Sequence, residues 1–90
     1  MKAIKMTVSG MVQGVGFRYT SKMLADKLNV AGIVRNQMDG DVYIEAQGDS
    51  DNLAKFIAGI KDSPSPAGRV TDVKISEIPL GDYTKFDVVY

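Results

Sequence analysis

A glycine-rich segment near the N-terminus delivers an arginine to a position where chemistry can occur. Residues 8–18 read Val-Ser-Gly-Met-Val-Gln-Gly-Val-Gly-Phe-Arg, so three glycines fall within seven residues. Because glycine has no Cβ, backbone N–H groups can converge there on a bound group. Convergent amides near a helix N-terminus form an anion site, and the planar fork of Arg18 matches phosphate or carboxylate oxygens. The segment therefore predicts an anion-binding loop that ends at Arg18.

The distribution of charge supports an anion at this loop. Residues 1–25 contain no Asp or Glu but carry Lys2, Lys5, Arg18 and Lys22, although the formal net charge of the chain is +0. A cation at a helix start opposes the helix dipole by up to about 1 kcal/mol, and a bound anion reverses that penalty. The zero net charge argues against a nucleic-acid binder that relies on a basic face. We therefore expect a small-molecule anion as ligand and no nucleic acid.

Two missing residue types narrow the chemistry further. The chain of 90 residues has no cysteine and no histidine. Disulfides, thiolate nucleophiles, zinc fingers and the commonest general base are excluded. Asp39 and Asp41 flank a turn glycine and are interpreted as turn residues, so no metal and no cofactor are expected. The length predicts one domain over residues 1–90.

The location is predicted from the start of the chain and from its hydropathy. The N-terminus reads Met-Lys-Ala before an alternating segment, without an apolar signal core. No apolar run approaches the length of a membrane span. We therefore expect a cytoplasmic protein without a membrane partner.

The periodicity of apolar residues predicts a βαββαβ order with a short extra C-terminal strand. Alternation predicts strands, 3.6-residue periodicity predicts helices, and the Asp-Gly pair predicts a hairpin. A stripe of Leu53, Phe56, Ile57 and Ile60 marks the second helix, which Asp49 or Ser50 can cap. This order is typical of an α+β, ferredoxin-like sandwich with two helices on one face of a largely antiparallel sheet. The expected elements are strands 4–9, 31–36, 42–47, 70–78 and 86–90, a helix over about residues 18–29, and a second helix that carries the stripe from Leu53 to Ile60.

This topology brings two distant residues together. The strands of the first βαβ unit run parallel, so their C-terminal ends lie at the same edge of the sheet. Arg18 follows the first strand and Asn36 ends the second, and we expect them to be neighbours in space. Arg35 should point to the opposite face. Tyr43, Glu45 and Gln47 are predicted to form the solvated face of the third strand.

A site built from these groups favours one class of phosphate compound. Phosphoryl transfer depends mostly on positioning and on stabilisation of charge. A phosphomonoester needs its alkoxide leaving group protonated, which a chain without histidine is poorly equipped to do. A carboxyl–phosphate anhydride releases a carboxylate whose conjugate acid has a pKa of about 4 and needs no such help. The residues therefore suit acyl phosphates better than phosphate esters.

At this point the sequence resembles the acylphosphatase family. Gly10-Met11-Val12-Gln13-Gly14-Val15-Gly16-Phe17-Arg18 matches the family's first signature, G-x-V-Q-G-V-x-F-R. Residues 32–36, Gly-Ile-Val-Arg-Asn, followed by Asp39-Gly40, resemble the second. Length, element order, the Pro-Ser-Pro-Ala-Gly-Arg-Val segment and the aromatic C-terminus also fit. One departure is Ile33, where the family usually has an aromatic residue; we expect this position to pack into the core.

The resemblance implies hydrolysis of acyl phosphates to a carboxylate and inorganic phosphate, without a metal or covalent intermediate. Arg18 would hold the phosphate and stabilise developing charge, and Asn36 would hold the attacking water. Inorganic phosphate would act as product or inhibitor, and the protein would be a monomer. The loop that binds phosphoryl oxygens through backbone amides would comprise Gln13, Gly14, Val15, Gly16, Phe17 and Arg18.

Two other functions are compatible with the same element order. One is a non-catalytic ferredoxin-like module that binds carbamoyl phosphate or another small anion, as in larger carbamoyl-transferring proteins. The other is an RNA-recognition module, which displays aromatic residues on its middle strands. Segment 42–47 offers one exposed aromatic residue, Tyr43, beside the acidic Glu45, which disfavours RNA.

Overall fold

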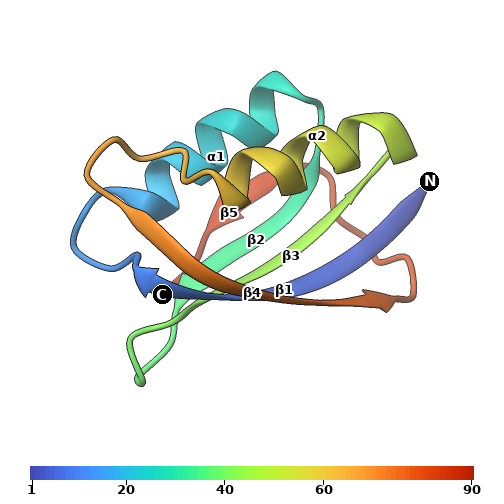
Figure 1. The fold of residues 1–90 in the computed structure, drawn as a ribbon. Helices are drawn as coiled ribbons and strands as arrows, with labels where there is room; N and C mark the ends of the chain where they lie inside the picture. The colour runs from blue at the N-terminus through green and yellow to red at the C-terminus, as the bar shows by residue number, and fades with distance from the viewer.

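The computed structural model describes residues 1–90, which form a five-stranded sheet and two helices (Figure 1). The elements in chain order are β1 (Lys2–Met11), α1 (Phe17–Lys27), β2 (Ala31–Asn36), β3 (Val42–Gly48), α2 (Ser50–Lys61), β4 (Arg69–Ile78) and β5 (Phe86–Val88). The sheet order is β4-β1-β3-β2-β5, with β5 parallel to β2 and the other neighbours antiparallel. The predicted α+β, ferredoxin-like plan with a short C-terminal strand is confirmed.

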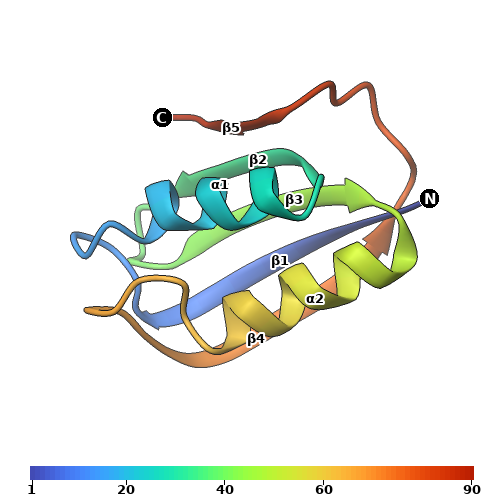
Figure 2. The ribbon, with the colours of Figure 1, turned by 90° about the horizontal axis from the view of Figure 1, so that it is seen from above.

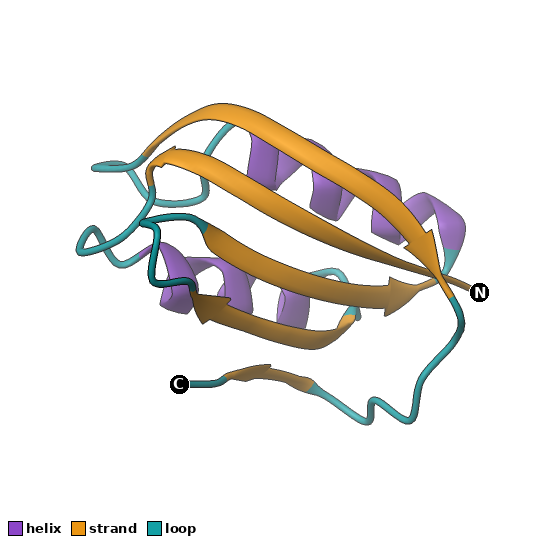
Figure 3. Ribbon diagram, turned by 90° about the horizontal axis from the view of Figure 1, so that it is seen from below, coloured by secondary structure: helices purple, strands orange, loops and turns teal.

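Both helices cover the same face of the sheet. Figure 2 shows α1 and α2 side by side above the strands, and Figure 3 shows that no helix covers the opposite face. Because β1 and β2 are each antiparallel to β3, they run parallel to each other. Their C-terminal ends therefore lie at one end of the sheet, as the sequence predicts. Neither helix is long and apolar enough to span a membrane.

The core lies between the helices and the sheet. The predicted stripe of α2 faces it, with Leu53, Phe56 and Ile60 buried and Ile57 partly buried. The ring of Phe56 packs edge-on against Phe86 of β5, with centroids 5.6 Å apart. The Asp49 side chain caps α2 by accepting the Asp51 N–H. The core thus fixes β5, the last strand, against the second helix.

Helix α1 (Phe17–Lys27) is shorter than the predicted helix over residues 18–29. It ends at Lys27, because Asn29 takes a left-handed conformation (φ 60°) that terminates the helix. Tyr19 and Met23 share an i,i+4 spacing but are exposed, at 69% and 59%. The fully buried residues of this helix are instead Phe17, Ser21 and Ala25.

The outer face of β3 is less solvated than predicted. Gln47 is only 9% exposed, because its side-chain amide forms two hydrogen bonds to the backbone of Gly81. The Tyr43 and Tyr83 hydroxyls both donate to the Glu45 carboxylate. The connection between β4 and β5 therefore crosses this face and covers part of it.

The prediction that Ile33 packs into the core is wrong. Val34, its neighbour on β2, is fully buried in the core, and successive strand residues point to opposite faces. Ile33 is therefore directed to the outer face, where it pairs with Glu45 in the sheet register and stays partly exposed. An aliphatic residue in place of an aromatic one does not alter the core at this position.

The cluster of Glu45 with Tyr43 and Tyr83, which we call the Glu45 cluster, makes the stability of the fold depend on pH in the acidic range. Hydrogen bonds from Tyr43 and then Tyr83 lower the pKa of the Glu45 carboxyl from its usual value of 4.5, although burial opposes them. A depressed pKa in the folded state stabilises the fold above the unfolded pKa, and this contribution disappears as pH falls through the folded pKa. We expect Glu45→Gln to flatten the acid limb of a plot of Tm against pH.

Circular dichroism melts between pH values of about 2.5 and 6 would measure this effect. Glu77→Gln, at an exposed position on β4, is the control and should leave the acid limb unchanged. Equal acid limbs in the parent and in Glu45→Gln would contradict the role of the cluster.

Candidate active site

A pocket lies where the first βαβ unit places the ends of its strands. Its volume is about 160 Å³. The β1–α1 loop, the β2–β3 hairpin, and the C-terminus all lie at the same end of the molecule (left in Figures 1 and 2). The lining residues come from that loop, the start of α1, the end of β2 and the C-terminal segment: Val12, Gly14, Gly16, Phe17, Arg18, Tyr19, Asn36, Val88 and Tyr90.

The loop presents unused backbone donors to this pocket. Gly14 and Gly16 have φ angles of 75° and 76°, which non-glycine residues rarely adopt. The N–H groups of residues 14–19 donate to no backbone or side-chain acceptor of the protein. Helix α1 has neither a side-chain cap nor an acidic residue in its first turn. The positive end of the helix dipole is therefore available to an anion.

Two members of the predicted phosphate loop are placed differently from the rest. Gly14, Gly16, Phe17 and Arg18 line the pocket, whereas the side chain of Gln13 turns away to the β2–β3 hairpin. Its amide donates to the carbonyls of Gln37 (2.7 Å) and Asp41 (2.9 Å). Gln13 thus joins the loop to the hairpin that follows Asn36.

Val15 does not line the pocket, but a hydrogen bond to its carbonyl also holds the loop in place. Its carbonyl accepts a 2.5 Å hydrogen bond from the hydroxyl of Ser65, a residue only 3% exposed in the α2–β4 connection. Sequence reasoning did not single out Ser65. Its one signal is a position within a Ser-Pro-Ser-Pro segment, which predicts a loop but not its contact.

Arg18 enters the pocket with its charge unneutralised by a carboxylate. Neither ion pair of the structure involves it. Its guanidinium carbon lies 4.8 Å from the centroid of the Tyr90 ring, a cation–π geometry that leaves the in-plane N–H donors free. Val88 and Tyr90 were not predicted as pocket residues, and the aromatic C-terminus was the only sequence signal for them.

Asn36 lines the same pocket as Arg18, as the topology predicts. Its Oδ1 is buried and has no hydrogen-bond partner within the protein. A buried acceptor without a partner costs about 1–3 kcal/mol, so such a group is usually satisfied by a ligand or water. Arg35, one residue earlier, lies on the opposite face with its guanidinium 4.7 Å from the Tyr43 ring centroid.

The acidic residues near this end of the molecule have a structural role. Asp39 accepts the Asp41 N–H at 3.0 Å within the β2–β3 turn, which agrees with their interpretation as turn residues. No Asp or Glu side chain lines the pocket. The site therefore combines one guanidinium, a set of backbone N–H donors and one carboxamide.

Comparison of the chain with known proteins identifies its family. The family model described as acylphosphatase matches residues 4–88. An acylphosphatase of Ligilactobacillus salivarius is 54% identical over 90 residues, covering all of both chains. The crystal structure of an acylphosphatase from Bacillus subtilis superposes with a TM-score of 0.96 at 42% identity, again over 100% of both chains.

The same fold also occurs inside a longer protein. Full-length HypF, solved in a phosphate- and nucleotide-bound form, matches with a TM-score of 0.87 at 31% identity. The match covers 99% of this chain but 12% of HypF. The family model and the full-length relatives agree with the signatures carried by the loop and by β2. The chain belongs to the acylphosphatase family, whose reaction is the hydrolysis of acyl phosphates to a carboxylate and inorganic phosphate.

Proposed function

We propose that this acyl phosphate hydrolase works by direct attack of a water molecule that Asn36 positions, without a metal ion. Hydrolysis of acyl phosphates follows from membership of the family. The observation that carries the mechanism is the shared pocket, in which free backbone donors, Arg18 and the unpartnered Asn36 carboxamide meet. Donors on one side and a water-binding group on the other are what an in-line displacement at phosphorus requires.

Phosphate binding is proposed for the loop from Gln13 to Arg18. The backbone N–H groups of Gly14, Val15, Gly16, Phe17 and Arg18 would bind phosphoryl oxygens. The Arg18 guanidinium would donate two parallel hydrogen bonds and stabilise the charge that develops in the transition state. For Gln13 and Val15, the bonds to the hairpin and to Ser65 support a further role in holding the loop.

No Asp, Glu, Lys or His side chain lines the pocket, and the proposed reaction needs no general acid or base from the protein. Water forms a bond to phosphorus as the bond from phosphorus to the carboxyl oxygen breaks. The carboxylate leaves without protonation because its conjugate acid has a pKa of about 4. The proton of the attacking water passes to a phosphoryl oxygen of the substrate, so inorganic phosphate is the second product.

A chelator experiment tests the independence from metal. We expect turnover of acetyl phosphate to be unchanged, within about twofold, by excess EDTA after exhaustive dialysis, because Arg18 and the loop supply the charge stabilisation that a metal would otherwise give. Phosphate release measures the rate. Activity that is lost in EDTA and restored by Mg²⁺ would contradict the mechanism.

Other properties are proposed with the mechanism. Inorganic phosphate should compete with substrate for the loop, since both present the same oxygens to Arg18. Packing of all seven elements around one core supports the proposal that residues 1–90 act as one domain. We also propose a monomer in the cytoplasm, which sedimentation and cell fractionation would test.

A further inference from the structure

One wall of the pocket belongs to the end of the chain. Val88 and Tyr90 line the pocket, and we call residues 86–90 the C-terminal arm. The arm joins the sheet only through the three residue pairs of β5 with β2 and one further bond, from the Val89 N–H to the Val34 carbonyl. It forms the edge of the sheet, with no strand beyond it. A strand this short at an edge has little local stability of its own, so its position depends on the packing of Phe86 against Phe56 and on contacts with α1.

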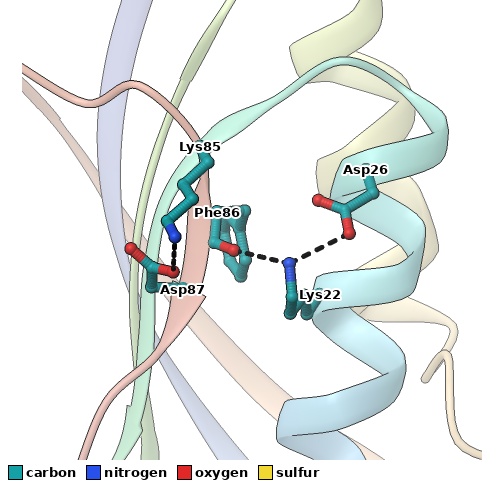
Figure 4. Close-up of polar contacts among 5 residues, drawn as sticks. All are labelled: Lys22, Asp26, Lys85, Phe86 and Asp87. Atoms are coloured by element: carbon teal, nitrogen blue, oxygen red, sulfur yellow. Dashed lines mark hydrogen bonds and ion pairs between the residues drawn. The ribbon is translucent and has the colours of Figure 1, made fainter.

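Lys22 provides such a contact from helix α1. Its ammonium donates to the carbonyl of Phe86 at 2.9 Å and to the carboxylate of Asp26 at 3.0 Å (Figure 4). The Phe86 ring is fully buried, and the Lys22 side chain is 34% exposed. A charged donor makes a stronger hydrogen bond than a neutral one, and partial burial reduces competition from water. Lys22 therefore joins α1 to the start of the arm.

The spacing of contacts links this bond to the pocket. Lys22 follows Arg18 by four residues, one turn along the same face of α1. Tyr90 follows Phe86 by four residues along the arm. Lys22 contacts Phe86 and Arg18 contacts Tyr90, so the helix and the arm meet at two points on either side of Val88. Helix α1 and the C-terminal arm therefore together position Val88 in the pocket lining and the Tyr90 ring beside the Arg18 guanidinium.

We propose that Lys22 is a positioning residue for the phosphate pocket. By holding Phe86 it places Val88 and Tyr90, which line the pocket, and it keeps the Tyr90 ring beside the Arg18 guanidinium. It acts through the arm and does not touch the substrate. This inference rests on the proposed site at Arg18 and Asn36. Asp26 contributes less, because an exposed i,i+4 ion pair contributes little and the bond to Phe86 does not require it.

The test is Lys22→Met, which keeps an unbranched chain of similar length and removes the donor. We expect KM for acetyl phosphate and the inhibition constant of inorganic phosphate to rise together by about fivefold, with kcat within about twofold, because ground-state and transition-state binding weaken equally. Lys22→Arg retains charge and donors and should restore both constants. Asp26→Asn, which keeps the bond to Phe86, should leave both near the parental values.

Loss of charge is separated from loss of position by a matched variant. Lys85 precedes Phe86, pairs with Asp87 at 3.7 Å, and lies on the other side of β5 from Lys22 (Figure 4). Lys85→Met removes the same charge without removing the contact, so its KM should not change. The effect of Lys22→Met should also persist in about 0.5 M KCl, where the Debye length is only a few ångströms. Assays well below each Tm exclude a loss of folded protein as the cause.

Unchanged KM and phosphate inhibition in Lys22→Met would overturn the proposal, as would an equal effect of Lys85→Met or an effect that vanishes in KCl. Arg18→Lys, assayed alongside, separates this inference from the site on which it rests. If Arg18→Lys is impaired and Lys22→Met is not, the role of Lys22 alone is wrong. If Arg18→Lys is unimpaired, the site itself is wrong.

Discussion

Arg18→Lys should lower kcat/KM for an acyl phosphate by roughly 10²-fold, or about 2.7 kcal/mol of transition-state stabilisation. Lysine keeps the positive charge but loses the planar pair of donors that fits two phosphoryl oxygens. It also loses the cation–π contact of the guanidinium with the Tyr90 ring. Because the charge is preserved, the measured loss reports geometry. Steady-state kinetics of phosphate release, with phosphate inhibition measured in parallel, would give both the transition-state and ground-state effects.

Arg35→Lys is a closely matched control for this experiment. Arg35 also stacks on a tyrosine, with its guanidinium 4.7 Å from the Tyr43 ring centroid, but it lies on the opposite face of β2 from the pocket. The same change there should leave kcat/KM within about twofold of the parent. Near-normal activity of Arg18→Lys would refute bidentate phosphate binding, and equal losses in the two variants would point to a general effect on folding.

The fold and the pairing of Arg18 with Asn36 could be predicted because both follow from local patterns. Alternation and helical periodicity define the elements, and the Asp39-Gly40 turn joins β2 to β3 in antiparallel register. A βαβ unit then requires parallel outer strands. That constraint places the C-terminal ends of β1 and β2 at the same end of the sheet, on either side of β3, so Arg18 and Asn36 can be expected in one pocket without any knowledge of the side-chain packing.

Contacts made by irregular segments could not be predicted in this way. The segment that covers Gln47 and Glu45 has no periodicity that would place Gly81 or Tyr83 against β3. Ser65 reaches Val15 across 50 positions of sequence from within a proline-containing loop. Such contacts depend on where a loop crosses the finished sheet.

Residue type also left the role of Gln13 incompletely defined. The sequence predicts that the loop binds phosphate through backbone amides, and it assigns no role to the side chain of Gln13. The structure directs the amide of this side chain to the carbonyls of Gln37 and Asp41. These carbonyls belong to the hairpin next to Asn36, so the glutamine connects the two halves of the site. This structural role of Gln13 becomes visible only when the structure places the hairpin next to the loop.

Asn36→Ala should separate catalysis from phosphate binding. We expect kcat to fall by about 10²-fold to 10³-fold, the loss typical of removing one positioned polar group that acts in the transition state. The inhibition constant of phosphate should change little, because the loop and Arg18 remain. Gln37→Ala is the control at the next position; it removes a neighbouring carboxamide but keeps the carbonyl that accepts from Gln13, so its kcat should stay near the parental value.

The same variant has an expected effect on stability that a merely structural asparagine would not give. The buried Oδ1 of Asn36 makes no hydrogen bond within the protein, so truncation to alanine breaks no internal hydrogen bond of this oxygen. Tm should therefore stay close to the parental value while kcat falls. Full activity of Asn36→Ala would remove the water-positioning role, and a large drop in Tm would show that the carboxamide serves the fold instead.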